Sequence, residues 1–350
     1  MATSSSGFAT RLQQAWQSRG LLATSLLPLA LMFGAVTAAR RWLYRRGILK
    51  EQRIDVPVLV VGNLVAGGAG KTPTVLALIA LLRREGWRPS IVSRGHGRST
   101  DHVLEVVPDT SAASAGDEPL LLRLRGGVPV FVGRDRVAAA RALRQRHPEV
   151  DIVVCDDGLQ HLRLARDAQV LVFDERGAGN GWLLPAGPLR EPMPAQVPVR
   201  TAVLYNATRP STPLPGHLAL RRLAGVVSLA DWWQDRQAAP EMISSLRGRP
   251  VLAAAGIARP QRFFSMLREA GLDIVEHALP DHHDYVQLDW PPGTTDVVMT
   301  EKDAVKITPQ RAAGVRLWVA ALDFGFDADF ERAVLALLPT RSAPPPLTRR

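Results

Sequence analysis

The sequence is poor in cysteine and in lysine. Its single cysteine, Cys155, cannot form an internal disulfide, and no cluster of cysteine and histidine has zinc-binding spacing, which favours a reducing compartment. The chain contains 43 Lys and Arg and has a formal net charge of +10. Arginine supplies almost all of this charge. An excess of basic residues favours acidic partners, of which an anionic lipid surface or a phosphorylated substrate fits best. The only lysines are Lys50, Lys71, Lys302 and Lys306.

Aromatic side chains are also scarce, at 6% of the chain, and they are not interleaved with the basic residues. A surface on which nucleic-acid bases stack needs that interleaving, so we expect no nucleic-acid partner. No internal repeat and no sign of an obligate protein partner is visible. A hydrophobic content of 46% and a charged content of 22% over 350 residues predict a globular protein long enough for two domains.

An uncharged stretch, LLATSLLPLALMFGAVTAA, occupies residues 21–39. At about 1.5 Å per residue, a helix of this length nearly matches a hydrocarbon core of roughly 30 Å. Pro28 and Gly34 interrupt the stretch, so a tilted or half-inserted anchor competes with a full span, and a cleaved secretory signal is the rival interpretation. The basic residues that follow favour the cytoplasmic side of an anionic membrane: Arg40, Arg41, Arg45, Arg46, Lys50 and Arg53.

From residue 55 onward, short apolar runs alternate with helical stretches, which predicts an α/β fold with a largely parallel sheet. A long irregular loop, dense in Gly and Pro, is expected at 177–198. In the first unit we expect strands at 56–61, 89–93, 128–132, 151–155 and 169–173, with helices at 74–84 and 134–146. In a second unit we expect strands at 249–255, 273–278, 295–300 and 316–322, with a helix at 260–270.

These expectations divide the chain into four parts. Residues 1–53 form a membrane-associating segment, and residues 54–200 form the first α/β domain. Residues 201–340 form a smaller α/β domain whose end could return to the core. Residues 341–350 are predicted to be a disordered tail because they are short and rich in proline.

The strongest motif is GNLVAGGAGKTP at residues 62–73, between the first predicted strand and helix. Such a loop wraps phosphates with backbone N–H groups, places Lys71 against them and puts the hydroxyl of Thr72 on Mg²⁺. Val65 stands where the general P-loop pattern has its first glycine, and an ordinary glycine-rich turn is the alternative. The residues expected to bind ATP are Gly67, Gly68, Ala69, Gly70, Lys71, Thr72 and Pro73.

Two acidic motifs offer groups for the same chemistry. CDDGLQH, at 155–161, follows an apolar strand, so Asp156 and Asp157 could hold Mg²⁺ beside the P-loop or could cap a helix or turn. AGDEPLLL, at 115–122, offers Asp117 or Glu118 as a base for a hydroxyl acceptor, and a capping role is the alternative. The motif PDHHDY, at 280–285, could be a metal cluster, an acid/base relay or a surface turn.

Basic motifs complete the pattern. SRGHGR at 93–98 and VGRDR at 132–136 each follow a predicted strand, so both should emerge at the sheet edge that carries the P-loop. Arginines there suit the recognition of phosphate or carboxylate. In TEKDAVK, at 300–306, Lys302 could reach a phosphate or pair with Glu301 or Asp303 in solvent.

Taken in this order, the motifs resemble those of the tetraacyldisaccharide 4'-kinases, the lipid A 4'-kinases of Gram-negative bacteria. Between about residues 57 and 306 the resemblance rests on VGNLVAGGAGKTP, SRGHGR, GDEPLLL, GRDR, CDDGLQH, GNGWLLPAGPLRE, GIARPQRFF, PDHHDY and TEKDAVK, together with the apolar N-terminal helix. It implies a P-loop NTPase-like, mostly parallel sheet, a second, smaller α/β domain, and a site in the cleft between them.

The resemblance also implies the activity, which is ATP-dependent phosphorylation of the 4'-hydroxyl of a tetraacyldisaccharide 1-phosphate. The cofactors would be ATP and Mg²⁺, and the partners a lipid A disaccharide precursor and an anionic membrane surface. The enzyme would work at the cytoplasmic face of the bacterial inner membrane. Two other functions remain as alternatives: a P-loop NTPase that acts as a switch or metallochaperone, which usually carries an N/T-K-x-D guanine motif that this sequence lacks, and a membrane-bound scaffold with a structural nucleotide site.

The resemblance further implies individual roles. Lys71 and Thr72 would hold the phosphates and Mg²⁺, and Asp117 would be the catalytic base with His282 as its partner. Val65 matches what the family tolerates. The metal and the nucleotide would be organised by Asp156, Asp157, Gln160 and Glu191. Substrate or phosphate contacts would come from Arg94, Arg98, Arg134 and Arg136.

Overall fold

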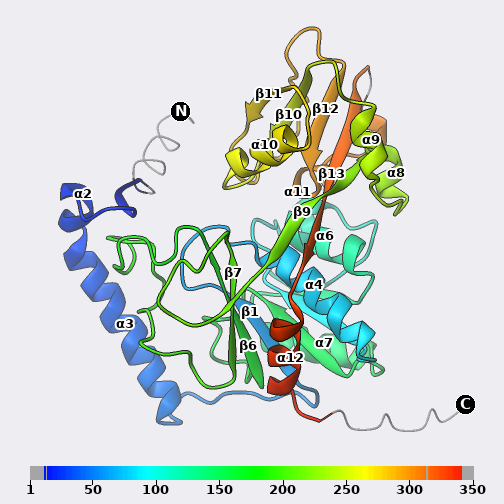
Figure 1. The fold of residues 1–350 in the computed structure, drawn as a ribbon. Helices are drawn as coiled ribbons and strands as arrows, with labels where there is room; N and C mark the ends of the chain where they lie inside the picture. Colours follow the sequence, from blue (N-terminus) through cyan, green and yellow to red (C-terminus); the bar gives the residue numbers. More distant parts are fainter. Residues whose placement is uncertain (1–11, 13, 313, 341–350) are drawn as a thin grey trace, which may run out of the picture.

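The computed structural model describes residues 12, 14–312 and 314–340, and the tail predicted at 341–350 lies outside them. Within the described residues, two mixed sheets form the framework (Figure 1). The larger sheet has the strand order β3-β4-β2-β5-β1-β6-β7-β8, and the smaller has the order β11-β10-β12-β13-β9. β3 pairs antiparallel with β4 and β9 with β13, whereas the other neighbouring strands run parallel. The expected α/β class is confirmed.

Helices cover both faces of the larger sheet. In β1, Leu59 and Val61 face the core beneath α4, α6 and α12, while Val58 and Val60 face the core beneath α7. All of β1 is buried, as expected for a parallel strand between two helical layers. The elements are β1 (Val58–Gly62), α4 (Lys71–Arg84), β2 (Pro89–Ser93), β3 (Leu104–Val106), α5 (Ala112–Ala115), α6 (Asp117–Gly126), β4 (Val130–Val132), α7 (Arg136–Arg146), β5 (Ile152–Asp156), β6 (Ala168–Asp174), β7 (Thr201–Asn206), β8 (His217–Leu218) and α12 (Ala328–Leu337).

The smaller sheet joins the larger unit through its two longest strands. β9 and β13 pair along their length and extend from the larger unit into the smaller one (Figure 1). Phe263, Phe264 and Leu267 of α10 fill the core on one face of this sheet. The elements are β9 (Leu220–Ser228), α8 (Leu229–Trp233), α9 (Pro240–Ser244), β10 (Val251–Ala255), α10 (Pro260–Glu269), β11 (Ile274–Ala278), β12 (Asp296–Thr300), α11 (Glu301–Ala304), a 3-10 turn η1 (Pro309–Arg311) and β13 (Arg316–Gly325).

The change from one sheet to the other comes later in the chain than residue 201, where the smaller unit was expected to begin. β7 pairs in parallel with β6, so residues 201–206 belong to the larger sheet. β8 extends that sheet, and the smaller one starts with β9. The chain then returns, because α12 packs Phe330 and Val334 into the core of the larger sheet. Several elements were not expected from the sequence: β3, α5, β7, β8, β9, α8, α9, α11, η1 and α12.

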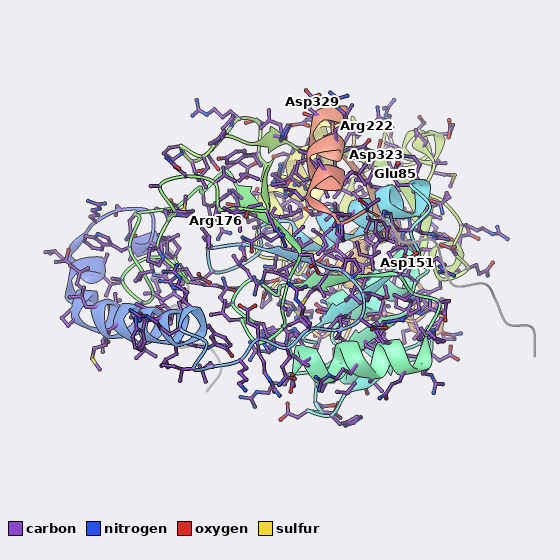
Figure 2. All side chains as sticks on the ribbon, turned by 90° about the horizontal axis from the view of Figure 1, so that it is seen from below. Glu85, Asp151, Arg176, Arg222, Asp323 and Asp329 are labelled. Carbon is purple, nitrogen blue, oxygen red and sulfur yellow. The ribbon has the colours of Figure 1, made fainter. Side chains whose placement is uncertain are left out.

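Two helices replace the single N-terminal helix expected at 21–39: α2 (Leu21–Ser25) and α3 (Leu27–Arg45). The break falls at Leu26 because Pro28, in the first turn of α3, has no N–H to continue the ladder from α2. α3 lies at one side of the molecule in both views (Figure 1, Figure 2). Arg41 ties it to the 177–198 loop through an ion pair with Glu191 of 2.9 Å. No helix among the described residues is both long and apolar enough to cross a membrane.

Candidate active site

The glycine-rich segment forms a loop between β1 and the first residue of α4, Lys71. Helix amides that lack partners within the helix therefore face this loop. The side chain of Asn63 holds this loop through two hydrogen bonds. Its Nδ2 donates to the Gly67 carbonyl at 3.2 Å, and its Oδ1 accepts from Lys71 Nζ at 3.1 Å. Gly70 has a φ of 87°, and a Cβ added there would lie 1.9 Å from Asn206 Nδ2. Glycine is therefore required at this position by both conformation and space.

Arg176 holds the other side of the loop. Its guanidinium donates to the carbonyls of Ala66, at 3.3 Å, and Gly68, at 2.9 Å. The same guanidinium pairs at 2.9 Å with Asp174, which is buried at the end of β6. Asn206, at the end of β7, donates to the Ala69 carbonyl at 3.2 Å. Sequence reasoning missed Arg176, Asp174 and Asn206, because each stands alone in a loop or at a strand end without a recognisable motif.

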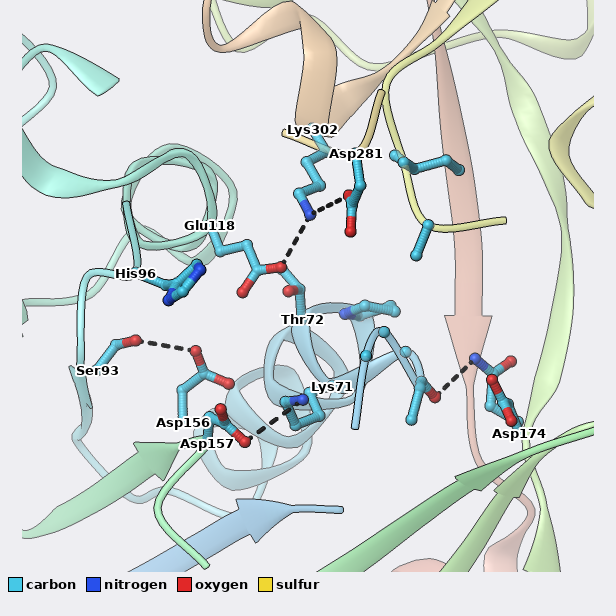
Figure 3. A pocket seen from close by; sticks show the side chains of 18 of the residues that line it. Lys71, Thr72, Ser93, His96, Glu118, Asp156, Asp157, Asp174, Asp281 and Lys302 are labelled. Carbon is cyan, nitrogen blue, oxygen red and sulfur yellow. Dashed lines mark hydrogen bonds and ion pairs between the residues drawn. The ribbon is translucent and has the colours of Figure 1, made fainter. Parts of the chain in front are cut away.

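Asp156, the last residue of β5, and Asp157, which follows it, lie beside the loop because β5 pairs with β1. Asp157 Oδ1 lies 3.4 Å from Lys71 Nζ (Figure 3). Burial favours the neutral form of Asp157, but Lys71 and Arg190 outweigh it and lower its pKa. Asp156 Oδ2 accepts from Ser93 Oγ at 3.0 Å, while its buried Oδ1 has no hydrogen-bond partner. Burial, with the negative charges of Glu118 and Asp157, raises the pKa of Asp156.

An aspartate of the larger unit meets a histidine of the smaller unit across the cavity. Asp117, the first residue of α6, places Oδ2 at 2.8 Å from Nδ1 of His282 and at 3.6 Å from Nζ of Lys306. Burial opposes ionisation, yet the hydrogen bond to His282 and the charges of Lys302 and Lys306 lower the pKa of Asp117 to about 2. His282 has a left-handed φ of 61°, a strained conformation of the kind found at functional sites.

Lys302 lies in the same cluster and not in solvent beside its sequence neighbours. Its Nζ is 3.1 Å from Glu118 Oε1 and 3.3 Å from Asp281 Oδ1 (Figure 3). Of the two alternatives for Lys302, the pairing with Glu301 or Asp303 in solvent is therefore wrong, because Lys302 points across the boundary between the two units. Asp303 instead pairs with Lys306. In the described part of the chain, no group of three or more His, Cys, Asp or Glu could hold a metal ion, so the metal-cluster interpretation of 280–285 is not supported.

A cavity of about 1150 Å³ collects these groups. The P-loop and the ends of β5 to β7 form one wall of the cavity, β9, β13, α10 and the 281–282 loop form the wall that faces it, and α3 closes one side. The cavity is lined by every residue predicted to act in the site except one, Arg98.

A family model described as LpxK, tetraacyldisaccharide-1-P 4'-kinase, matches residues 22–339. The chain belongs to this family. A tetraacyldisaccharide 4'-kinase of Leptothrix cholodnii is 56% identical, over 97% of this chain and 99% of the relative. One of Methylibium petroleiphilum is 57% identical, over 94% and 95%. The crystal structure of the "apo" form of LpxK from Aquifex aeolicus in complex with ATP has a TM-score of 0.74 and 26% identity, covering 91% of this chain and all of that one.

Membership in the family confirms the predicted enzyme class. Gln160 donates through Nε2 to the Asn63 carbonyl at 3.3 Å, and Glu191 is paired with Arg41. Both are therefore engaged with the protein itself. Arg190, next to Glu191 in the chain, pairs with Asp157 at 3.1 Å. Sequence reasoning missed this residue. The motif GNGWLLPAGPLRE contains Arg190, so the signal was in the sequence, although no role was given to it.

The four predicted arginines occupy different environments. Arg94 and Arg134 line the cavity. Arg136 also lines it but is almost fully buried, donating to the carbonyls of Gly133 and Arg134, while its Nε has no partner. Arg98 lies outside the cavity lining, against Gly95, and its two terminal nitrogens are buried without hydrogen-bond partners. The structure thus brings three of the four to the cavity.

The residues beside the P-loop fit a magnesium ion. Mg²⁺ usually takes one or two carboxylates together with substrate phosphates and waters, and it does not need a closed protein cage. Asp156 offers a buried oxygen without a partner, and its surroundings raise its pKa. A nearby cation would stabilise the ionised carboxylate and so lower that pKa. Thr72 and Asp157 line the same part of the cavity.

Proposed function

We propose that the chain transfers the γ-phosphoryl group of ATP to the 4'-hydroxyl of a tetraacyldisaccharide 1-phosphate, a step of lipid A biosynthesis. The 4'-oxygen forms a bond to the γ-phosphorus, the bond from that phosphorus to the β–γ bridging oxygen breaks, and ADP leaves. Family membership, the P-loop and the ATP complex of the Aquifex aeolicus relative support this reaction. An alcohol acceptor also requires a group that takes its proton.

The contact between Asp117 and His282 is the observation that carries the proposal. Asp117 accepts the proton of the 4'-hydroxyl as the phosphoryl group moves, and His282 orients the carboxylate. The low pKa of Asp117 keeps it ionised at neutral pH. Because Asp117 and the P-loop line one cavity, an acceptor hydroxyl bound between them would face the γ-phosphate.

Phosphate binding is assigned to the segment 67–73. Lys71 and the amides at the start of α4 offset the negative charge that is shared by the γ-phosphate and the leaving group. Thr72, Asp156 and Asp157 would hold Mg²⁺, with Gln160 and Glu191 in the surrounding shell. When bound there, Mg²⁺ neutralises charge on the β- and γ-phosphates.

Acceptor binding is assigned to the side of the cavity beside α3. Arg94, Arg134 and Arg136 suit an acceptor that already carries a phosphate, and Arg98 lies in the same loop as Arg94. We place the enzyme at the cytoplasmic face of the inner membrane, where α2 and α3 would contact lipid and raise the local concentration of the acceptor. Large apolar side chains exposed on these helices are Leu21, Leu22, Leu29, Leu31, Met32, Val36 and Trp42.

Transfer of labelled γ-phosphate tests the function directly. In detergent micelles with tetraacyldisaccharide 1-phosphate, the wild type should yield a lipid phosphorylated at the 4'-position, identified by phosphorus NMR of the product. Lys71→Ala should lower the rate on the order of 1000-fold, since it removes a cation that stabilises the transition state. Arg332→Ala, an exposed substitution on α12, serves as the control and should retain the rate. Hydrolysis of ATP that leaves the lipid unmodified would refute the proposal.

A further inference from the structure

The ammonium group of Lys302 makes a third contact that neither the motif nor the proposed mechanism uses. Besides Glu118 and Asp281, its Nζ lies 3.1 Å from Nε2 of His282, on the side of the imidazole ring opposite Asp117. The Lys302 side chain is 17% exposed and that of His282 is 35% exposed. His282 therefore lies between a carboxylate at Nδ1 and an ammonium at Nε2.

The chemistry of the two groups decides which atom carries the proton. An ammonium has three N–H donors and no acceptor. At 3.1 Å its partner Nε2 must accept, so Nε2 carries no proton. The remaining proton of the neutral ring is then on Nδ1, which donates to Asp117 Oδ2 at 2.8 Å. A doubly protonated imidazole would place an N–H group directly against an ammonium.

The surrounding charges keep Lys302 in the ammonium form. Burial favours its neutral form, but Glu118, Asp117 and Asp281 outweigh it and raise its pKa. The pKa of His282 is raised overall, because the hydrogen bond to Asp117 outweighs burial and the Lys302 charge, which both lower it. The titratable groups that face the ring or lie in this cluster are Asp117, Glu118, Asp281, Lys302, Lys306 and His96, whose ring centroid is 5.7 Å from that of His282.

We propose that Lys302 is a positioning residue for the catalytic base, whose ammonium holds His282 as the neutral tautomer with its proton on Nδ1. This inference rests on the proposed role of Asp117. A neutral imidazole orients the carboxylate through one hydrogen bond and leaves its charge available to the acceptor hydroxyl. An imidazolium would form an ion pair with Asp117 and make the carboxylate a weaker base.

The pH dependence of kcat distinguishes two roles for Lys302: setting the tautomer of His282, or only joining the two units. In Lys302→Met the pKa of His282 should rise further, so the acid limb of the kcat profile should move up by about one pH unit. Near that limb kcat should fall about tenfold, and it should recover to within about threefold of wild type at pH 9. Lys302→Arg keeps a charged donor and should restore the wild-type limb.

Glu118→Gln is the matched control, because it breaks the same link between the two units without touching the imidazole. Removing this negative charge should leave the acid limb in place or move it to lower pH, the direction opposite to that of Lys302→Met. If the two variants instead lower kcat alike at every pH, Lys302 only links the units and the proposal is overturned.

The tautomer can be measured without any activity. In protein labelled with ¹⁵N-histidine, long-range ¹H–¹⁵N spectra at pH 7.5 should show His282, assigned by its loss in His282→Gln, as the neutral Nδ1–H tautomer. In Lys302→Met the same ring should be protonated on both nitrogens. An Nε2–H tautomer or an imidazolium in the wild type would overturn the proposal. The expected spectra with a wild-type rate in Asp117→Asn would instead overturn the function of the base and leave the tautomer assignment intact.

Discussion

The P-loop wall of the cavity and the wall that faces it are held in different ways. On the P-loop wall, Asn63, Asn206 and Arg176 donate to main-chain carbonyls, and all three come from the larger unit. On the opposite wall, His282 and Lys302 of the smaller unit reach the larger unit through the side chains of Asp117 and Glu118. The first wall is therefore set when the larger sheet folds. The second also depends on how the two units are placed.

A substitution in the P-loop wall should have the largest effect, on the binding of ATP. Gly70→Ala should weaken ATP binding on the order of 100-fold, because a left-handed residue with a side chain is strained and the new Cβ would displace Asn206. Titration of the protein with ATP measures this. Gly248→Ala is the matched control, with a φ of 78° and no atom within 4 Å of the added Cβ. If both variants bind ATP like the wild type, the loop is not held as described.

The contribution of the opposite wall to stability should fall in acid. The pKa of Asp117 is about 2 in the folded protein and 3.8 in the reference state. The carboxylate therefore contributes stability that is complete above about pH 4 and is lost as the pH falls through 2. This contribution is about 2 kcal/mol. Urea unfolding between pH 5 and pH 2.5 should show a smaller loss of stability in Asp117→Asn than in the wild type, and parallel curves would contradict the assignment.

A smaller effect is expected where the two walls meet, at the end of β6. Arg259, just before α10, pairs with Asp174 at 3.3 Å and with Glu175 at 2.8 Å. Arg259→Ala should lower kcat/KM about fivefold, since Asp174 keeps Arg176 and the pair is partly exposed to solvent. Arg222→Ala breaks an exposed pair with Asp323 on the connecting strands and should change little (Figure 2). Equal losses in both variants would show that the link at β6 has no special role.

The same contrast explains what the sequence could predict. The P-loop wall is made from contiguous segments: a strand, a glycine-rich loop and a helix, then a second strand that ends at Asp156 and is followed by Asp157. Such local order is visible in the spacing of residue types, so these elements were predicted to within a few residues. α4 begins at Lys71, three residues before its predicted start at 74, because the P-loop turns directly into the helix.

The opposite wall could not be derived from spacing. From spacing, Lys302 could reach a phosphate or pair with its neighbours Glu301 and Asp303, whereas its partners Glu118 and Asp281 come from other parts of the chain. The partnership of Asp117 with His282 was available only through resemblance to a family. Local pattern contains no information on how two sheets are placed relative to each other, and that placement creates these contacts.

The most direct test of the account is single-turnover transfer by Asp117→Asn at saturating ATP. We expect ATP affinity close to that of the wild type, because the P-loop wall is intact, and a rate of transfer to the lipid lower by about 100-fold to 10,000-fold, because the base is lost. An asparagine variant that binds ATP and phosphorylates the lipid at the wild-type rate would contradict the claim that the facing wall supplies the base.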